Sequence, residues 1–168
     1  MIPLVISSYR RNLPHLQRDD KAHFLTFCTF RRWILPEWAR DIVLRTCIRA
    51  DGWTVDLYAV VVMPDHVHMV FVPRLDETKT EVISLARITK AIKGSSAHFI
   101  NRRLARNGRT WQEESFDRVL RFSEKIEEKV LYILENPVRK GLVASWKDYR
   151  WLWHRGFENA PSFARPGR

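Results

Sequence analysis

Two β-branched and apolar runs, separated by a Pro-Asp turn signal, constrain the fold more than any other feature of this chain. The first run is 54–63 (TVDLYAVVVM) and the second is 66–72 (HVHMVFV), with Pro64 and Asp65 between them. Residues of these types favour strands, and Pro-Asp favours a turn. The segment therefore predicts a β-hairpin, whose two strands run antiparallel.

The flanking segments predict two more strands and a helix between the first strand and the hairpin. Residues 23–30 (HFLTFCTF) are aromatic and β-branched, which favours a strand, and 111–122 has the character of an extended segment. A helix is expected over 36–50, because Pro36 suits a first helical turn and Gly52 follows its end.

Two further helices are predicted in the second half of the chain. One covers 81–104, where Gly94 weakens the pattern and favours a kink. The other begins at Ser123, a natural N-cap, and is expected to end near Asn136, because Pro137 disfavours helical geometry in the residue before it. The apolar face of the first of these helices is predicted to consist of Leu85, Ile88, Ile92 and Phe99.

The resulting order of elements is β-α-β-β-α-β-α, with Gly141 closing the turn after the last helix. This order is typical of an α+β ferredoxin-like β-α-β-β-α-β sandwich with an antiparallel sheet, here with an added C-terminal helix. We expect a basic N-terminal arm over 1–20, one folded domain over 21–143 and a Trp-rich basic C-terminal tail over 144–168.

Charge and composition narrow the class of partner. The chain has 168 residues, of which 29 are Lys or Arg and 19 are Asp or Glu, giving a formal net charge of +10. This excess predicts a polyanionic partner, either nucleic acid or an acidic membrane surface. No apolar run has the length that a membrane span needs. Cys28 and Cys47 form no metal or disulfide pattern, so a reducing cytoplasm is expected.

The His66-Val67-His68 sequence is the first candidate for chemistry. Residues two apart in a strand point to the same face, so both imidazoles are expected to project together. Two neighbouring neutral imidazoles provide half of a divalent metal site. Two ordinary surface histidines are the alternative. Asp65 is expected to point to the other face if the strand includes it.

Tyr132 and Asn136 are the second candidate. They are four residues apart on the last predicted helix and share a face with Lys129. A solvated amphipathic tyrosine and a nucleophile for phosphodiester attack both fit this position. Tyr132 lies away from the apolar stripe of the helix, which consists of Ile126, Val130, Ile133 and Leu134.

The third candidate for function is a stretch whose charged side chains are all basic. Residues 87–109 contain Arg and Lys but neither Asp nor Glu. Contact with nucleic-acid phosphates and a solvated face are the two interpretations, and the length of the stretch favours phosphates. Abundant aromatic residues offer platforms for unpaired bases, although Phe24, Phe27 and Phe71 are expected in the core. The predicted DNA contacts are Arg10, Arg11, Arg87, Lys90, Lys93, Arg102, Arg103, Arg106 and Lys129.

Several segments together resemble a known family. MPDHVHMVF resembles the His-hydrophobic-His (HUH) strand of single-tyrosine transposases that act on single-stranded DNA. WQEESFDRVLR and LYILENPVRKGLV are similar to a strand and the nucleophile helix of REP-associated tyrosine transposases, and YRRNLPHLQRDDKAHFLTFCTFRRWIL is similar to their N-terminal region. The match extends from about Tyr9 to Val143. The region after Val143 departs from the short Tyr-x-Trp-Ser-Ser ending of many relatives, because Leu152-Trp153-His154 follows Trp151.

This resemblance implies that 21–143 is an HUH transposase-like catalytic domain. Tyr132 would be the nucleophile, and His66, His68 and Asn136 would hold a divalent metal, Mg²⁺ or Mn²⁺. The two-histidine, one-amide set makes Mn²⁺ plausible. The implied activity is nicking and joining of single-stranded DNA at REP-type hairpins through a 5′-phosphotyrosine intermediate.

The resemblance further implies a monomer or homodimer that acts on single-stranded or hairpin DNA in the bacterial cytoplasm, associated with the nucleoid and not with a membrane. Besides a structural protein with a basic tail, which explains neither the position of Tyr132 nor the histidine pair, two other functions stay open from the sequence. One is a non-cleaving protein of the same fold that binds structured DNA. The other is a metal-dependent hydrolase of small phosphates, against which the large basic surface argues.

Overall fold

The computed structural model describes residues 21–120 and 126–156. The predicted arm at 1–20, Phe122, Ser123 and residues 157–168 lie outside the described residues. Within the described part, the order of strands and long helices is the predicted one, followed by a further short strand. The elements are β1 (His23–Cys28), η2 (Phe30–Arg32), α2 (Glu37–Arg49), β2 (Val55–Val62), β3 (His66–Pro73), α3 (Leu85–Arg103), β4 (Phe116–Val119), α4 (Ile126–Arg139), η3 (Trp146–Asp148) and β5 (Leu152–His154).

The strands form a five-stranded sheet in the order β4-β1-β3-β2-β5, and all neighbours are antiparallel. The predicted hairpin is confirmed, since Val62 pairs with Val67 and the Met63 amide donates to the His66 carbonyl at 2.8 Å. Strand β1 lies between β3 and β4, and this pairing places Thr26 opposite both His68 and Phe116.

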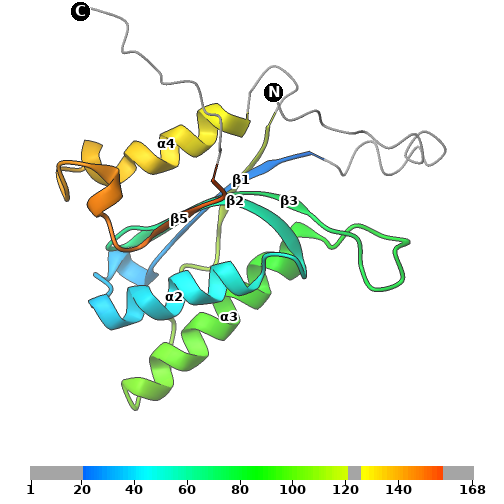
Figure 1. Cartoon of the computed structure of the whole chain (residues 1–168). Coiled ribbons are helices and arrows are strands. Elements are labelled where there is room, and N and C mark those ends of the chain that lie inside the picture. Colours follow the sequence, from blue (N-terminus) through cyan, green and yellow to red (C-terminus); the bar gives the residue numbers. More distant parts are fainter. Residues whose placement is uncertain (1–20, 121–125, 157–168) are drawn as a thin grey trace, which may run out of the picture.

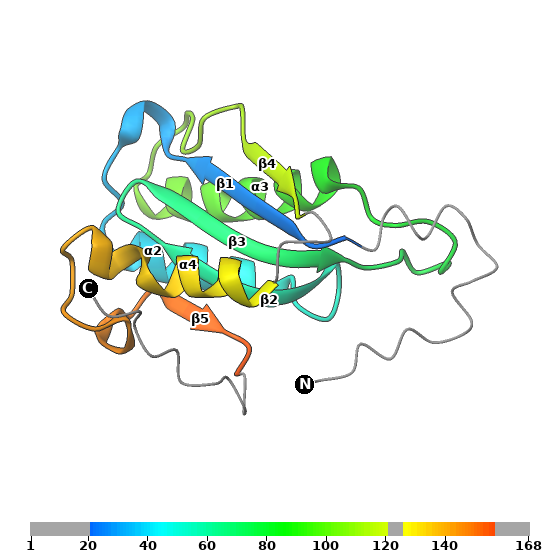
Figure 2. The ribbon, with the colours of Figure 1, turned by 90° about the horizontal axis from the view of Figure 1, so that it is seen from above.

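The helices lie on both faces of the sheet. Helices α2 and α3 cover one face, and α4 lies on the other (Figures 1 and 2). The α+β sandwich with an antiparallel sheet and an added C-terminal helix is therefore confirmed. In the described part of the chain, no helix is long and apolar enough to cross a membrane.

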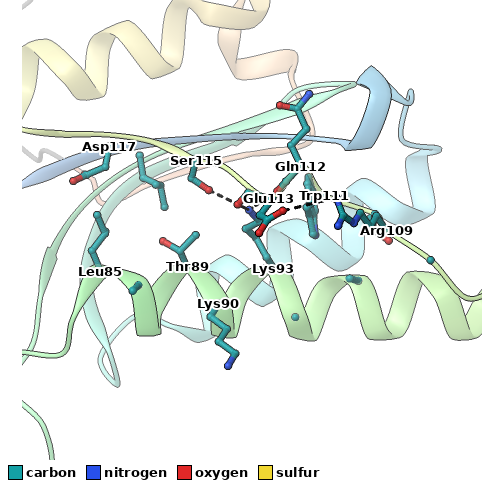
Figure 3. A pocket seen from close by; sticks show the side chains of 16 residues that line it. Leu85, Thr89, Lys90, Lys93, Arg109, Trp111, Gln112, Glu113, Ser115 and Asp117 are labelled. Atoms are coloured by element: carbon teal, nitrogen blue, oxygen red, sulfur yellow. Dashed lines mark hydrogen bonds and ion pairs between the residues drawn. The ribbon is translucent and has the colours of Figure 1, made fainter.

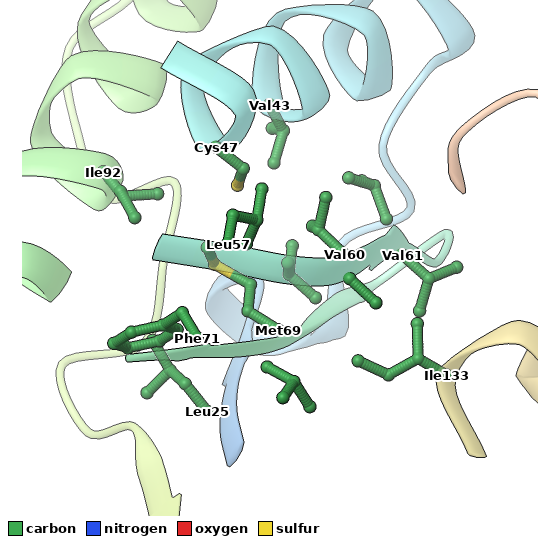
Figure 4. Close-up of a cluster of buried hydrophobic side chains, with 14 of the residues drawn as sticks. Leu25, Val43, Cys47, Leu57, Val60, Val61, Met69, Phe71, Ile92 and Ile133 are labelled. Carbon is green, nitrogen blue, oxygen red and sulfur yellow. The ribbon is translucent and has the colours of Figure 1, made fainter. Parts of the chain in front are cut away.

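The core is built from the sheet and the inner faces of the helices. Figure 4 shows Val43 and Cys47 of α2 near Leu57 of β2, and Ile133 of α4 close to Val61. All five side chains are fully buried. Phe27 and Phe71 are buried as predicted, whereas Phe24 is only half-buried. Because helices cover both faces, most of β2 and β3 is buried, as their continuous apolar runs require.

The structure corrects two helix predictions. Helix α3 runs without interruption through Gly94, and Ile100 is buried in place of Phe99, which is 47% exposed. Helix α4 does not end at Asn136 but continues through Pro137 to Arg139. Pro137 is buried, so packing of its ring offsets the backbone hydrogen bond that proline cannot make.

The chain after α4 returns to the sheet. Gly141 closes the helix with a φ of +69°, as predicted, because a residue without Cβ adopts this geometry without strain. Strand β5 then pairs with β2, and the buried Tyr149 hydroxyl donates to the Val62 carbonyl at 2.9 Å. Trp151 is buried, and its indole N–H donates to Asp41 of α2 at 2.9 Å. Residues 146–154 thus brace the end of the sheet that carries the β2–β3 turn.

Candidate active site

A cavity of about 550 Å³ lies between the sheet and α4. Two of the residues that line this cavity belong to β3, two to β1 and three to α4. Arg32 and Lys140 come from the segments beside these elements. The cavity contains all four residues that the sequence singled out for metal binding and nucleophilic attack. Its lining consists of Thr26, Cys28, Arg32, His66, His68, Tyr132, Asn136, Arg139 and Lys140.

The two histidines lie next to each other at the start of β3. Their ring centroids are 4.7 Å apart, with the ring planes nearly perpendicular. Strand alternation accounts for this, because Val67 between them points to the opposite, buried face. The structure thus brings both imidazoles to one cavity.

His66 is held by the acidic residue that precedes it. Its Nδ1 lies 2.6 Å from Asp65 Oδ1, and the other carboxylate oxygen accepts from Arg32 Nε at 2.9 Å. Asp65 was expected to point to the other face only if the strand included it, and this condition is not met, because β3 begins at His66. A carboxylate bound to Nδ1–H leaves Nε2 with the lone pair that a metal ion would use.

His68 is 8% exposed, and its Nδ1 lies 2.7 Å from the Thr26 hydroxyl on the neighbouring strand. Burial is the main cause that lowers the pKa of His68 to about 3, and nearby positive charges add to it. The imidazole is therefore neutral at physiological pH, as a metal ligand must be.

Tyr132 is 41% exposed and lines the cavity from α4. Its ring makes edge contacts with His68, at 5.9 Å between centroids, and with Phe24, at 5.7 Å. Arg139, two turns further along α4, places its guanidinium carbon 4.1 Å from the ring centre and donates to the Tyr132 carbonyl at 2.9 Å. A cation over the ring face stabilises this position of the tyrosine.

Asn136 lies one turn after Tyr132 and is 4% exposed. A buried amide normally has hydrogen-bond partners or a ligand. Here the amide lines the same cavity as the imidazoles.

The donor set fits a divalent cation. Two neutral imidazoles and an amide oxygen form a mixed nitrogen and oxygen set, which suits Mn²⁺ and leaves coordination positions for water and phosphate oxygens. Among residues 21–120 and 126–156, no group of three or more His, Cys, Asp or Glu side chains is placed to hold a metal. The Asn136 amide lines the same cavity as His66 and His68 and is the candidate for a third protein ligand.

Positive charge surrounds this cavity, and the sequence interpretation missed its source. Arg139 and Lys140 follow Asn136 by three and four residues, and Arg32 reaches the cavity from η2. The helical period would have placed Arg139 on the Asn136 face, but the predicted end of α4 at Asn136 excluded it. Thr26 and Cys28 were missed because only the pairing of β1 with β3 brings them there.

The basic residues of α3 lie on the opposite face of the sheet from this cavity (Figure 1). Arg87, Lys90 and Arg102 have solvent-exposed side chains. The guanidinium of Arg103 lies 4.6 Å from the ring centre of Trp38, and that of Arg106 lies 4.4 Å from that of Trp33.

The Lys93 side chain forms hydrogen bonds within the protein. Its ammonium donates to the carbonyls of Gln112 and Glu113, at 2.6 and 2.9 Å, and to the Ser115 hydroxyl at 3.2 Å. Burial lowers the pKa of Lys93. These bonds fasten the segment before β4 onto α3, and the four bonded residues line a second cavity of about 700 Å³ (Figure 3). Lys129, on α4, is half-buried, and Arg10 and Arg11 lie outside the described residues.

Comparison with known proteins finds a transposase family model and a structurally similar transposase. Residues 17–135 match the family model described as transposase IS200 like. A solved REP-associated tyrosine transposase bound to a REP hairpin is similar in fold, with a TM-score of 0.64 and 21% identity over 88% of this chain and 82% of that chain. A Deinococcus radiodurans R1 structure, described as a candidate transposase, gives a TM-score of 0.43 and 21% identity over 68% of this chain and 88% of that chain. Comparison with curated proteins gives no match. Because the family model covers most of the chain, including β1 to β4 and both histidines, this protein belongs to the IS200-like transposases.

Proposed function

We propose that this protein nicks and rejoins single-stranded DNA, with Tyr132 as the nucleophile and with His66, His68 and Asn136 holding a divalent metal ion, Mn²⁺ or Mg²⁺. The observation that carries the proposal is the convergence of these four residues on one cavity, in a chain of the IS200-like transposase family. The histidines come from β3 and the other two residues from α4, so only the folded chain creates this combination.

In the proposed reaction, the Tyr132 phenolic oxygen attacks the phosphorus of a scissile phosphodiester. A phosphorus–oxygen bond to Tyr132 forms, the bond from phosphorus to the 3′ oxygen breaks, and the phenolic proton is transferred through solvent to that oxygen. The products are a 5′-phosphotyrosine link and a free 3′-OH. Attack by a 3′-OH on the phosphotyrosine reverses the step and rejoins a strand, because the number of phosphodiester bonds is conserved.

The protein's own residues supply position and charge. Arg139, Lys140 and Arg32 surround the cavity with cations that compensate the phosphate charge. Asp65 and Thr26 fix the imidazoles of His66 and His68, and a bound ion would act as a Lewis acid on the scissile phosphate. The Phe24 and His68 rings limit where the Tyr132 ring can lie.

A REP-type hairpin is the proposed substrate, because the structurally similar transposase was solved bound to a REP hairpin. The basic residues predicted from the sequence on the arm, on α3 and on α4 are the proposed contacts to its backbone, except Lys93, whose ammonium is already bound within the protein. We place the activity in the bacterial cytoplasm, on nucleoid DNA, with the protein acting as a monomer or homodimer.

A covalent trapping assay tests the proposal. Purified protein is incubated with Mn²⁺ and labelled hairpin DNA from the repeats that flank its own gene, and the products are separated on a denaturing gel. We expect a shifted protein–DNA band in the wild type and in Tyr58→Phe, a tyrosine of β2 that does not line the cavity, and no such band in Tyr132→Phe. His66→Ala and His68→Ala should lose the Mn²⁺-dependent band.

Each alternative has its own outcome. A band that persists in Tyr132→Phe would show that another residue is the nucleophile. Binding without any band would favour the non-cleaving DNA-binding protein. The absence of binding, together with hydrolysis of small phosphate esters, would favour the small-phosphate hydrolase.

A further inference from the structure

Strand β4 places an exposed aromatic residue on the same face of the sheet as the candidate active site. Phe116 pairs directly with Thr26, and Thr26 in turn pairs with His68 on β3. Directly paired residues of antiparallel strands point to the same face. Thr26 and His68 both line the active-site cavity, so Phe116 points to that side of the sheet.

The neighbouring residues confirm this orientation. Ser115 and Asp117, on either side of Phe116, line the cavity on the α3 face, together with Leu25 of β1. Figure 3 shows Ser115 and Asp117 above α3, on that side of the sheet. Alternation along β4 then requires Phe116 to project away from α3.

Phe116 is 61% exposed, although a phenylalanine gains by burial. It lies two strands from His68, which corresponds to about 10 Å across the sheet. Helix α4 packs over β2 and β3, and Figure 2 shows β1 and β4 beside it and not beneath it. Among the described elements, no helix therefore covers the β1–β4 part of this face.

The path between Phe116 and the cavity suits a nucleic acid strand. Phe24 of β1 contacts both His68 and Tyr132, with ring centroids 5.3 and 5.7 Å apart, so aromatic rings continue from the cavity toward β4. Arg32, Arg139 and Lys140 supply positive charge at the cavity. Single-stranded DNA binds where a cationic track runs beside aromatic faces, because every base has a face that can stack.

We propose that Phe116 is the stacking platform for one unpaired base of the DNA strand, a few nucleotides from the scissile phosphate. This inference rests on the proposed function for the position of the strand. The occupant is a nucleobase, because the platform is a single ring beside a cationic cavity and not an extended apolar groove. Base stacking is tolerant of sequence, so Phe116 positions the strand without selecting it.

Abasic scanning tests this proposal in a metal-free binding assay, where no cleavage occurs. The probe is a hairpin with a ten-nucleotide single-stranded 5′ extension, and one base is removed at each extension position in turn. We expect Phe116→Ala to weaken binding of the intact probe about 5- to 150-fold, the range that loss of one base–aromatic stack gives. Phe116→Trp should bind like the wild type, and Phe116→Leu, which keeps apolar bulk, should bind like Phe116→Ala.

The decisive result is coupling between the side chain and one base. In the wild type, removal of one particular base should weaken binding, and in Phe116→Ala the same removal should have no further effect. Trp53→Ala is the control, since Trp53 is an exposed aromatic residue in the turn between α2 and β2 and is not among the proposed DNA contacts. It should leave both the affinity and the abasic profile unchanged.

The outcomes separate this inference from the proposed function. Equal abasic profiles in the wild type and Phe116→Ala, or wild-type affinity in Phe116→Leu, would overturn the stacking platform even if Tyr132 still forms its adduct. Coupling at one base without any adduct in Mn²⁺ would support the platform and contradict the nuclease. Failure of the wild-type protein to bind the probe would overturn both.

Discussion

Asp65 Oδ1 lies 2.6 Å from His66 Nδ1, and the same carboxylate also accepts from Arg32 at 2.9 Å. The carboxylate therefore links the imidazole to a cation of η2 and fixes the orientation of the ring. Thr29 holds Asp65 in turn, because the Asp65 carbonyl accepts from the Thr29 amide at 2.9 Å and from the Thr29 hydroxyl at 3.1 Å. This arrangement is the usual support of a histidine that binds a metal.

Asp65→Asn is expected to weaken Mn²⁺ binding about 10- to 100-fold, because the amide no longer favours a proton on Nδ1 of His66. Isothermal titration calorimetry with Mn²⁺ alone measures this effect. Asp56→Asn is the matched control, since Asp56 forms an exposed ion pair with Arg74 on the sheet at 2.7 Å. Equal Mn²⁺ affinity in both variants and the wild type would show that Asp65 does not position His66.

Arg139→Gln is expected to lower the rate of adduct formation about 10- to 150-fold, the effect of losing a hydrogen bond to a charged group. The guanidinium both lies over the Tyr132 ring and faces the cavity, so its loss affects the nucleophile and the phosphate together. Arg139→Lys should retain part of the rate, since it keeps the charge but not the planar donor group.

The control for this prediction is Arg45→Gln, which changes an exposed arginine of α2 on the other face of the sheet. Single-turnover gel assays with saturating hairpin DNA give the rate of adduct formation for each variant. A wild-type rate in Arg139→Gln would remove Arg139 from the mechanism.

Local patterns were sufficient to predict most of the fold. The β2–β3 hairpin follows from two β-branched runs around Pro64-Asp65, and α2 begins and ends within one residue of its predicted limits. The apolar stripe of α4 is also as predicted, with Val130, Ile133 and Leu134 buried. These features depend on short-range periodicity, which the sequence displays directly.

The parts that were not predicted depend on contacts between distant residues. Phe99 fits the apolar period of α3 as well as Ile100 does, and only the position of the sheet decides which one is buried. The residues around the histidines come from the register of β1 against β3, which local pattern does not specify. Arg139 was overlooked for a local reason, because Pro137 was expected to end α4.

Ser96→Ala is expected to lower the free energy of unfolding by about 1–3 kcal/mol, the cost of leaving a buried donor without a partner. Ser96 is fully buried, and its hydroxyl accepts from the Trp111 indole N–H at 3.0 Å. This bond ties α3 to the segment that leads into β4. Urea denaturation measures the change, and Ser95→Ala, at an exposed position of the same helix, is the matched control. Equal stability of the two variants would contradict the importance of this bond.

Cys47 is expected to resist thiol reagents until the protein unfolds. It is fully buried among the residues of α2 and β2, and burial raises the pKa of its thiol from 9.0 to about 12. The reactive species is the thiolate, so Cys47 is both inaccessible and protonated in the native state at pH 8. Mass spectrometry after iodoacetamide treatment should find Cys28, which is half-exposed, labelled in the native protein and both cysteines labelled in urea.

The same burial predicts how stability depends on alkaline pH. The unfolded chain loses the Cys47 proton near pH 9.0, whereas the folded chain keeps it up to a pKa of about 12. The unfolded state thus binds fewer protons in this window, and stability falls as pH rises. The contribution of Cys47 to this fall is about 1.4 kcal/mol per pH unit. Cys47→Ala lacks this contribution, so its free energy of unfolding should decline less steeply between pH 9 and pH 11 than that of the wild type. Parallel slopes in urea titrations across that range would show that the thiol ionises in the folded protein as readily as in the unfolded chain.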